Sequence, residues 1–336
     1  MTRKSRAILL RRYPVGIPQA DDFELVEAEV QEPRDGEVLV HTHFLSMDPA
    51  PRMRMNGGAT FPPPMLLGET VGGRGMGTVC ASRFEPLKVG DLVAGELGWQ
   101  EYARLPGVQL RRVDPACKTP QSALGVLGPP GITAWFLTTE AGKIKAGDTV
   151  VVAGAAGSVG SVAVQLCKLA KARVVGLTGS ERQAAFVRRE LRADAAVDYR
   201  SSNLGSDLAA ACPSGVDVFL DSVGGALHDT VMAQITDHAR IVVFGFIAAY
   251  AEATTRLEYG DMYQVIRRRA ELRGFLVGDY APRFAEALRE LAARLADGRI
   301  QSFEHVSEGL ASAPAAFAAL FTGDPVGKQL VRVRSP

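Results

Sequence analysis

The stretch Gly154-Ala155-Ala156-Gly157-Ser158-Val159-Gly160 places three glycines between an apolar run and an amphipathic run. Glycine has no side chain, so such a turn lets backbone N–H groups at a helix N-terminus come close to phosphate oxygens. Gly157 is placed for that approach, and Gly160 lets the following helix pack closely on the preceding strand. Ala155 stands where the G-x-G-x-x-G pattern has its first glycine. The turn predicts a site for the pyrophosphate of a dinucleotide, and an ordinary glycine-rich loop is the alternative.

The segments around this turn have the pattern of a βαβ unit. Residues 149–153 form a short apolar, β-branched run that is typical of a strand buried on both faces. From residue 158 to about residue 171 the apolar residues recur on one face of a helix, and residues 173–178 form a second apolar strand. Strand, turn, helix and strand in this order are the context that a dinucleotide site requires.

The end of the second strand indicates which dinucleotide is preferred. A site that prefers NAD usually has an acidic residue there for the ribose hydroxyls, but this chain has Gly179 and Ser180. A small polar residue with a cation nearby suits a 2′-phosphate, and Arg182 is such a cation. The pattern favours NADP over NAD, although Glu181 argues against it and Arg182 could also be a solvated helix residue.

Further strands are predicted at 195–199, 216–220, 241–245 and 272–277, and helices at 181–191 and 283–298. Alternating strands and helices argue for a parallel sheet covered by helices on both faces, whose carboxyl ends face the ligand crevice. Three segments follow such ends and are expected around one site: Ser222, then Phe244, Gly245, Phe246, Ile247 and the residues to Tyr250, then Phe275, Leu276 and Val277.

Two tyrosines in this region could act chemically or merely pack. The phenol of Tyr250 is neutral at pH 7, so it could donate a hydrogen bond to a developing oxyanion and also a proton. An aromatic residue packing on the crevice wall is the alternative. Tyr199 could pack against a cofactor ribose or simply cap the sheet.

The remaining sequence is consistent with two domains. Residues 1–120 contain short β-like runs broken by Gly and Pro, which suggests a small barrel or an irregular sandwich. The runs are 6–10, 23–30, 37–44, 70–80 and 92–94. Residues 121–300 contain the α/β pattern, and the tail from 326 to 334 returns to a strand pattern that could rejoin the first domain.

Bulk properties exclude several classes of function. The chain has 336 residues, of which 47% are hydrophobic and 22% charged, as in ordinary globular proteins. Its formal net charge of +1 gives no excess of basic charge that would attract nucleic acid or an acidic membrane surface. No stretch reaches the about 18 uncharged apolar residues of a membrane span, so a cytoplasmic protein is expected. The four cysteines lie far apart, which argues against structural zinc. His41 and His43 share a strand face and could suggest a metal site, but surface or half-buried strand histidines that bind no metal are commoner.

Several stretches resemble the zinc-independent branch of the medium-chain dehydrogenase/reductases, and more narrowly the alkenal, prostaglandin, curcumin and plant double-bond reductases. The matching segments cover nearly the whole chain in the family's order: 45–55, 124–136, 146–169, 218–225, 240–250, 273–288 and 315–333. The resemblance implies a GroES-like domain of residues 1–120 plus the tail 301–336, and a Rossmann domain of residues 121–300. It also implies NADP(H), a small-molecule enone or enal substrate, and usually a homodimer.

Residue roles follow from the same resemblance. Ala156, Gly157, Ser158 and Val159 match the pyrophosphate turn, and Tyr199 matches a further cofactor contact. Ser222, the segment from Phe244 to Tyr250, and Phe275 to Val277 match the lining of the nicotinamide half. Tyr250 matches the tyrosine that is held to assist at the substrate carbonyl in these reductases, which makes it the candidate catalytic residue.

The chain also departs from the family pattern. Gln183 stands where a lysine commonly serves the 2′-phosphate, so Ser180 or Arg182 would have to substitute. Ser222 and Pro325 replace asparagines, and Asp48-Pro49-Ala50-Pro51-Arg52 lacks the usual tyrosine of D-P-Y-M-R. Gly68-Glu69-Thr70 has no histidine, unlike the Gly-His-Glu motif of the zinc-dependent relatives, so no metal is expected.

Together these observations give one main hypothesis and two alternatives. The main hypothesis is an NADPH-dependent reduction of the C=C bond of α,β-unsaturated ketones or aldehydes, by hydride transfer to the β-carbon with stabilisation of the enolate and without zinc. One alternative is an NADPH:quinone reductase of the same fold. The other is a protein that binds NADPH without catalysis.

Overall fold

The computed structural model describes residues 4–57, 63–114, 119–251, 262–322 and 325–333, and it divides into two compact units. The β-rich unit comprises Met1–Leu124, Glu304–Thr322 and Lys328–Pro336. The α/β unit comprises Gly125–Phe303 and Gly323–Gly327. Among the described residues, no helix combines the length and the apolar character needed to cross a bilayer.

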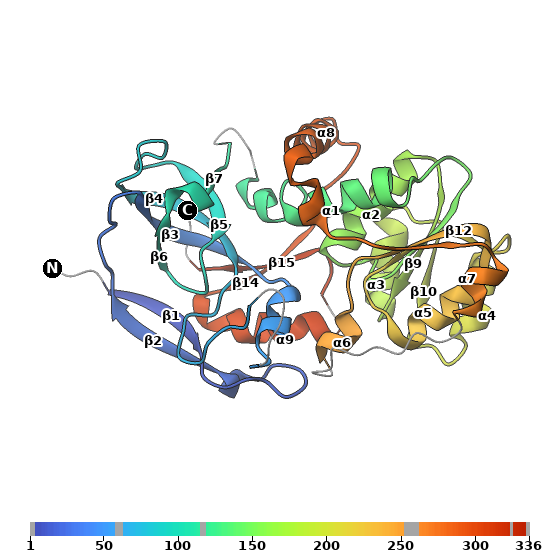
Figure 1. Cartoon of the computed structure of the whole chain (residues 1–336), viewed down its shortest axis with the longest axis horizontal. Coiled ribbons are helices and arrows are strands. Elements are labelled where there is room, and N and C mark those ends of the chain that lie inside the picture. The colour runs from blue at the N-terminus through green and yellow to red at the C-terminus, as the bar shows by residue number, and fades with distance from the viewer. Residues whose placement is uncertain (1–3, 58–62, 115–118, 252–261, 323–324, 334–336) are drawn as a thin grey trace. The chain divides into compact units, whose positions relative to one another are not determined.

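The α/β unit is built on a six-stranded parallel sheet (Figure 1). Its strands are β8 (Thr149–Val152), β9 (Arg173–Thr178), β10 (Ala195–Asp198), β11 (Val216–Asp221), β12 (Ile235–Val243) and β13 (Glu271–Gly274). Their order across the sheet is β10-β9-β8-β11-β12-β13, the order of a doubly wound Rossmann fold. The topology changes direction between β8 and β11, and ligands of such sheets bind at the carboxyl ends beside this point. The predicted α/β fold class is confirmed.

Helices cover both faces of this sheet because its strands are apolar on both faces. Val150 and Val152 of β8 pack in one core cluster, whereas Val151 packs in a second cluster on the opposite face. The helices of the unit are α1 (Pro129–Phe136), α2 (Ser158–Leu169), α3 (Glu181–Arg189), α4 (Leu204–Ala211), α5 (Gly225–Met232), α6 (Ile247–Ala251), α7 (Tyr263–Arg267) and α8 (Phe284–Ala296). A π-helical turn η5 (Leu137–Ala141) follows α1, and a 3₁₀ segment η6 (Val277–Arg283) precedes α8.

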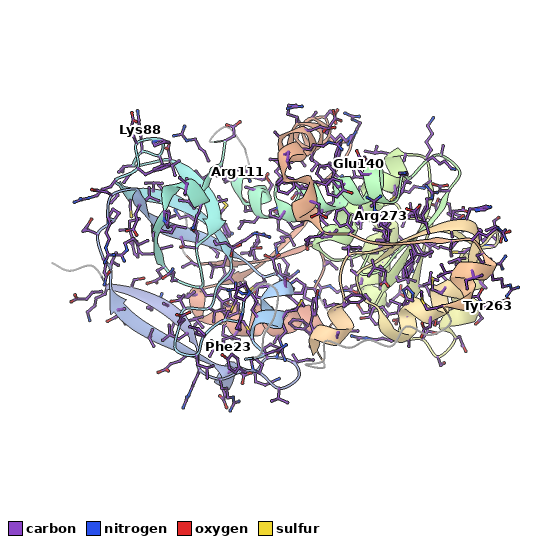
Figure 2. The ribbon with its side chains drawn as sticks, in the orientation of Figure 1. Phe23, Lys88, Arg111, Glu140, Tyr263 and Arg273 are labelled. Carbon is purple, nitrogen blue, oxygen red and sulfur yellow. The ribbon has the colours of Figure 1, made fainter. Side chains whose placement is uncertain are left out.

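Two hydrogen bonds of Arg273 tie the outer strand of this sheet to the helical segments η5 and η6. The guanidinium of Arg273 on β13 donates to the hydroxyl of Tyr280 at 3.1 Å and to the carbonyl of Glu140 at 3.4 Å. Figure 2 labels Arg273 and Glu140 in the α/β unit. Tyr280 in turn stacks on Phe275, with ring centroids 5.4 Å apart. These contacts hold the segment that follows β13.

The β-rich unit contains a seven-stranded sheet in the order β14-β15-β3-β4-β5-β7, with β6 paired to β3, and a separate hairpin of β1 and β2. Its strands are β1 (Lys4–Leu10), β2 (Phe23–Glu29), β3 (Glu37–Ser46), β4 (Arg74–Ser82), β5 (Leu92–Glu96), β6 (Tyr102–Pro106), β7 (Arg111–Arg112), β14 (Glu304–Glu308) and β15 (Lys328–Arg332). Its helical segments are η1 (Ala20–Asp22), η2 (Ala50–Arg54), η3 (Gly107–Gln109), η4 (Pro120–Leu124), η7 (Leu310–Ser312) and α9 (Ala313–Thr322). The tail strand β15 pairs antiparallel with β3, and the fold class of this unit is confirmed.

Several predicted element bounds are wrong. The strand predicted at 70–80 begins only at Arg74, because Gly72 and Gly73 precede it and Thr70 makes just an isolated bridge with Leu9. The strand predicted at 272–277 ends at Gly274, where the chain turns into η6. The strand predicted at 241–245 is instead Ile235–Val243, and it ends before Gly245. Residue 334 of the predicted tail strand lies outside the described residues.

Candidate functional site

The glycine turn after β8 is shaped by its lack of side chains. Gly154 has φ +61°, and a Cβ there would lie 3.1 Å from the hydroxyl oxygen of Ser222. A Cβ at Gly160 would lie 2.2 Å from the carbonyl oxygen of Gly154, so α2 can begin against the turn only with glycine at that position. The amide of Gly157 donates to the Gly154 carbonyl at 2.9 Å, which closes the turn.

The alanine in place of the first motif glycine has a structural counterpart on β9. Ala155 is buried, and its amide donates to the carbonyl of Leu177 at 3.2 Å. A Cβ at Gly176 would lie 2.8 Å from the Cβ of Ala155 and 2.6 Å from a methyl of Val187. The missing side chain at Gly176 therefore makes the room that the methyl group of Ala155 occupies.

The N-terminus of α2 presents backbone donors for which the described residues offer no acceptor. Ser161 is the first helical residue whose amide reaches back into the turn, donating to Gly157 at 2.9 Å. Within the described part of the chain, the amides of Ser158, Val159 and Gly160 donate to no protein acceptor. Ala156 is held from its other side, because its carbonyl accepts from Gly327 at 2.7 Å. Free N–H groups at the positive end of a helix dipole form a site for an anion such as a pyrophosphate.

At the carboxyl ends of β9 and β10, Gly179 lies directly against Tyr199. A Cβ at Gly179 would be 2.5 Å from the Tyr199 hydroxyl oxygen, so the phenol ring covers this glycine. Ser180 caps α3, where its hydroxyl accepts from the amide of Gln183 at 3.3 Å. That hydroxyl still has a proton to donate. Arg182 is exposed in the first turn of α3.

Gln183 is not placed to bind a phosphate. Its side-chain oxygen accepts from the amide of Gly179 at 2.9 Å, and its side-chain nitrogen donates to the carbonyl of Pro325 at 2.9 Å. The side chain is buried, so both ends of the amide are engaged inside the α/β unit. Gln183 therefore shapes the loop at Gly179 rather than replacing the lysine of the family pattern.

A cation that the sequence prediction missed lies beside Tyr199. The guanidinium carbon of Arg200 lies 5.8 Å from the centroid of the Tyr199 ring, and the Arg200 side chain is exposed. The amide of Arg200 donates to the carboxylate of Asp198 at 2.9 Å, which fixes the backbone at this strand end. Only the position of Arg200 directly after the predicted Tyr199 could have indicated it in the sequence.

On the other side of the switch point, three strand ends are linked by hydrogen bonds. The hydroxyl of Ser222 donates to the carbonyl of Ala153 at 3.2 Å, and the carbonyl of Ser222 accepts from Ile247 at 3.0 Å. The amide of Phe244 donates to Asp221 at 2.9 Å. A Cβ at Gly245 would lie 3.2 Å from the Ser222 carbonyl oxygen. The structure thus brings Ser222 together with the predicted segment from Phe244 to Ile247.

The buried pair of Asp221 and His228 supports the loop that contains Ser222. Asp221 accepts hydrogen bonds from the amides of Val223 and Gly224 at 2.9 and 3.0 Å through one carboxylate oxygen. Its other oxygen lies 2.8 Å from Nδ1 of His228, and both side chains are buried. The sequence prediction missed this pair, because its members are seven residues apart and belong to no motif.

The remaining predicted residues lie at the ends of β12 and β13. Tyr250 is half-buried on α6, and burial raises the pKa of its phenol above the ordinary value of 10.0. Phe275 is tied to β12, because its amide donates to the carbonyl of Val243 at 2.9 Å. Val277 is half-buried, whereas the side chain of Leu276 is exposed.

Comparisons with known proteins agree with this architecture. Residues 6–113 match a family model described as the N-terminal domain of oxidoreductase, and residues 158–293 match one described as zinc-binding dehydrogenase. YfmJ of Bacillus subtilis is 39% identical over 339 residues, covering all of both chains. The NADPH-dependent curcumin reductase of Escherichia coli is 34% identical over 98% of this chain and 97% of its own.

A solved structure indicates the same family. CurA from Vibrio vulnificus, in complex with NADPH, superposes with a TM-score of 0.93 at 35% identity, covering 98% of this chain and all of the CurA chain. The chain belongs to the medium-chain dehydrogenase/reductase superfamily. Within this superfamily it lies close to the curcumin and prostaglandin reductases.

Among the residues that the structure describes, no three His, Cys, Asp or Glu side chains gather in a group that could hold a metal ion. His41 and His43 pack edge to face, and His41 stacks on Tyr102 with ring centroids 4.6 Å apart. Cys80, Cys167 and Cys212 form no disulfide with one another in the described part of the chain, and Cys117 lies outside the described residues.

Proposed function

We propose that this protein reduces the C=C bond of α,β-unsaturated ketones and aldehydes with NADPH. The chain is an NADP-dependent oxidoreductase of the double-bond reductase family. The observation that supports the proposed site most strongly lies at the switch point of the sheet, where the amides of Ser158, Val159 and Gly160 donate to no acceptor in the part of the chain that the structure describes. These donors suit the pyrophosphate of a dinucleotide.

The residues present fit such a cofactor. The cradle at Gly154, Gly157 and Gly160 has no room for side chains, so its backbone is open to a phosphate. Ala156 to Val159 would hold the pyrophosphate; Ser180, Arg182, Tyr199 and Arg200 would hold the 2′-phosphate and ribose. Ser222, the segment from Phe244 to Tyr250 and the segment from Phe275 to Val277 would line the nicotinamide. NADPH, when bound, supplies the hydride that is added to the β-carbon.

The chain's own contribution to the chemistry is assigned to Tyr250. As the β-carbon is reduced, negative charge gathers on the carbonyl oxygen of the substrate, and a neutral phenol can donate a hydrogen bond to it. Burial raises the pKa of Tyr250, so this donor keeps its proton at neutral pH. The α-carbon then takes a proton from water or from Tyr250, which completes the addition of two hydrogens across the C=C bond.

We assign no zinc to this reaction, because Gly68-Glu69-Thr70 lacks the histidine of the zinc-dependent relatives.

We also propose that the protein is a homodimer, as the family resemblance implies. Within the described residues, β13 lies at the end of the parallel sheet and pairs with β12 alone. Sedimentation velocity at several protein concentrations tests the assembly directly.

The decisive experiment measures oxidation of NADPH and of NADH against a panel of enones, enals and quinones, with product analysis. The proposal expects NADPH to be used in preference, and a saturated ketone or aldehyde to form in a one-to-one ratio with the NADPH consumed. Turnover of quinones alone would favour the quinone reductase. Tight NADPH binding without oxidation against any acceptor would indicate a non-catalytic protein.

A further inference from the structure

Residues 325–327, called the tail segment below, belong to the α/β unit and contact two of its loops. The amide of Gly327 donates to the carbonyl of Ala156 at 2.7 Å. The carbonyl of Pro325 accepts from the side-chain nitrogen of Gln183 at 2.9 Å. The tail segment therefore contacts both the glycine turn after β8 and the first turn of α3, which follow neighbouring strands of the parallel sheet.

Gln183 extends this link to the loop at the end of β9. Its side-chain oxygen accepts from the amide of Gly179 at 2.9 Å, while its side-chain nitrogen serves the tail segment. The side chain is buried, so water competes little for these two hydrogen bonds. A glutamine suits both neighbours, because one end of its amide accepts and the other donates. A lysine at this position has only donors and could not accept from Gly179.

The far end of the tail segment is fixed by close packing. Gly327 has φ +70°, a left-handed conformation that favours glycine, and a Cβ there would clash with the carbonyl oxygen of Phe303. Phe303 in turn packs edge to face on Phe186 of α3, with ring centroids 5.0 Å apart. The tail segment therefore has little room to move away from the turn that contains Ala156.

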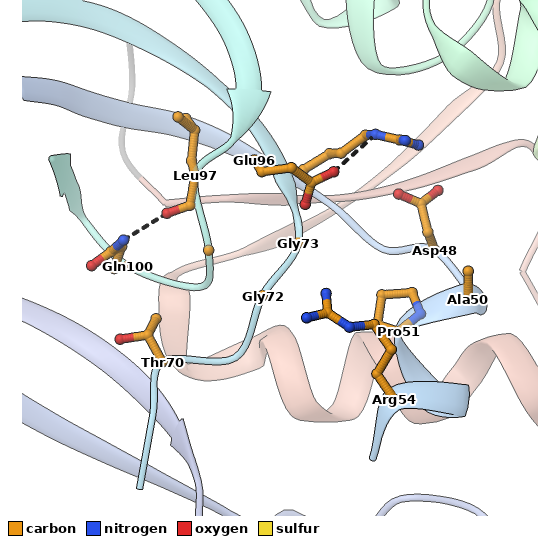
Figure 3. Close-up of a pocket in the computed structure, with 12 residues that line it drawn as sticks. Asp48, Ala50, Pro51, Arg54, Thr70, Gly72, Gly73, Glu96, Leu97 and Gln100 are labelled. Carbon is orange, nitrogen blue, oxygen red and sulfur yellow. Dashed lines mark hydrogen bonds and ion pairs between the residues drawn. The ribbon is translucent and has the colours of Figure 1, made fainter. Parts of the chain in front are cut away.

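Directly after the tail segment the chain enters the β-rich unit at Lys328. Nζ of Lys328 donates to the carboxylate of Asp48 at 2.8 Å, and Asp48 lines a hollow of that unit (Figure 3). The contacts of Pro325 and Gly327 described above, by contrast, involve only residues of the α/β unit. The link between the two loops of the α/β unit is therefore a property of that unit alone.

We propose that Gln183 and the tail segment form a bridge that fixes the spacing between the pyrophosphate turn and the Gly179 loop, so that both loops meet one dinucleotide together. Gln183 is then a positioning residue for the cofactor and not a phosphate ligand. This inference rests on the cofactor site of the proposed function. A site whose parts are already correctly spaced loses less conformational freedom when the ligand binds. The pyrophosphate and the ribose are common to NADPH and NADH, so loss of the bridge should weaken both equally.

The first test is Gln183→Met, which keeps the length of the side chain and removes both of its hydrogen bonds. Fluorescence titration without any acceptor should show the Kd of NADPH and the Kd of NADH each rising by about tenfold. Loss of a phosphate ligand would instead weaken NADPH alone. An effect on NADPH alone, or no effect on either cofactor, would overturn the inference.

Thr236→Val is the matched control for this test. The hydroxyl of Thr236 donates to the carbonyl of Val216 at 3.2 Å and to the carboxylate of Asp217 at 2.8 Å, at the amino ends of β11 and β12. The control therefore also removes two hydrogen bonds from the α/β unit, but at the edge of the sheet opposite the proposed cofactor site. Both Kd values should stay at those of the wild type.

A second variant opens the bridge from its other end. Gly327→Ala places a methyl group against the carbonyl of Phe303, so the tail segment should move and both Kd values should again rise by the same factor. Gly298→Ala is the control, because Gly298 also has a positive φ, +72°, but a Cβ there meets nothing within 4 Å. Wild-type Kd values in Gly327→Ala would contradict the bridge.

Hydrogen exchange of the cofactor-free protein measures the bridge itself. In Gln183→Met, peptides that contain Gly179 and peptides that contain Gly327 should both exchange several-fold faster, although the substitution leaves the acceptor of the Gly327 amide in place. Faster exchange at Gly179 alone would show a purely local role for Gln183 and overturn the inference.

These measurements need no turnover, so their outcome is separate from that of the proposed reaction. A wild-type protein that binds NADPH but reduces no enone would contradict the proposed function, whereas equal weakening of both cofactors in Gln183→Met would still support the bridge. If enones are reduced, Gln183→Met should raise the KM for NADPH by about tenfold and leave kcat unchanged, because its hydrogen bonds concern the end of the cofactor away from the nicotinamide. A fall in kcat without a rise in this KM would overturn the positioning role.

Discussion

A methyl group at Gly179 would lie 2.5 Å from the hydroxyl oxygen of Tyr199, so the bare backbone at the end of β9 fixes the position of this ring. Gly179→Ala should therefore displace Tyr199 and raise the Kd for NADPH by about tenfold, through lost contact with the ribose. Fluorescence titration with NADPH measures the change. Gly205→Ala is the control, because a Cβ at Gly205 meets nothing within 4 Å. An unchanged Kd in Gly179→Ala would remove Tyr199 from the cofactor site.

Arg200 should contribute to the preference for NADPH over NADH. Arg200→Gln is expected to raise the Kd for NADPH by about tenfold and to leave that for NADH nearly unchanged, because only NADPH has the 2′-phosphate. Arg182→Gln, measured in parallel, shows which of these two arginines makes the contact. Arg189→Gln on the exposed face of α3 is the control. Equal effects of Arg200→Gln on both cofactors would contradict the assignment.

The centre of the α/β unit was largely predictable, because β8 and β9 are rich in β-branched residues and the turn between β8 and α2 needs particular glycines. The short helices α4 and α5 were missed, since each has only eight residues and little room for a periodic pattern. Their faces are instead defined by packing on the sheet, where Leu208 and Val231 join the same core cluster.

The candidate site was predictable only where it follows strand ends. Sequence order could not show that Gln183 is engaged by Pro325, because 142 residues separate them. Nor could it show that Gly176 makes room for Ala155, since the contact joins β9 to the turn that follows β8.

Tyr250→Phe tests the oxyanion donor. Removing such a donor typically lowers the rate of the chemical step by about a hundredfold, so kcat for an enone should fall by that order when chemistry limits turnover. Because burial raises the pKa of Tyr250 above 10.0, ionisation of this phenol should cause no loss of activity in wild type as the pH rises toward 9. Steady-state kinetics across pH measures both effects. Tyr263→Phe, at a side chain 65% exposed on α7, is the matched control.

Lys328 and Asp48 should be strongly coupled in stability. Lys328→Met leaves the Asp48 carboxylate without its buried partner, and the free energy of unfolding should fall by about 3 kcal/mol. The double variant Lys328→Met with Asp48→Asn should recover part of this loss, because no unpaired charge remains. Urea unfolding of the two single variants and the double variant gives the coupling energy. Additive losses would show that the 2.8 Å contact contributes no specific stability.

His43 should make the fold sensitive to mild acid. Burial, and then the neighbouring His41, lower the pKa of His43 below its ordinary value of 6.5. The unfolded chain therefore binds a proton at this position more readily than the folded chain, and stability should decrease as the pH falls through 6.5 toward the folded-state pKa. His43→Gln removes this titration, so its free energy of unfolding should change less between about pH 7.5 and about pH 5.5 than that of the wild type. His305→Gln, on the exposed side of β14, should retain the wild-type pH dependence. An identical pH dependence in His43→Gln and wild type would place the acid sensitivity elsewhere in the chain.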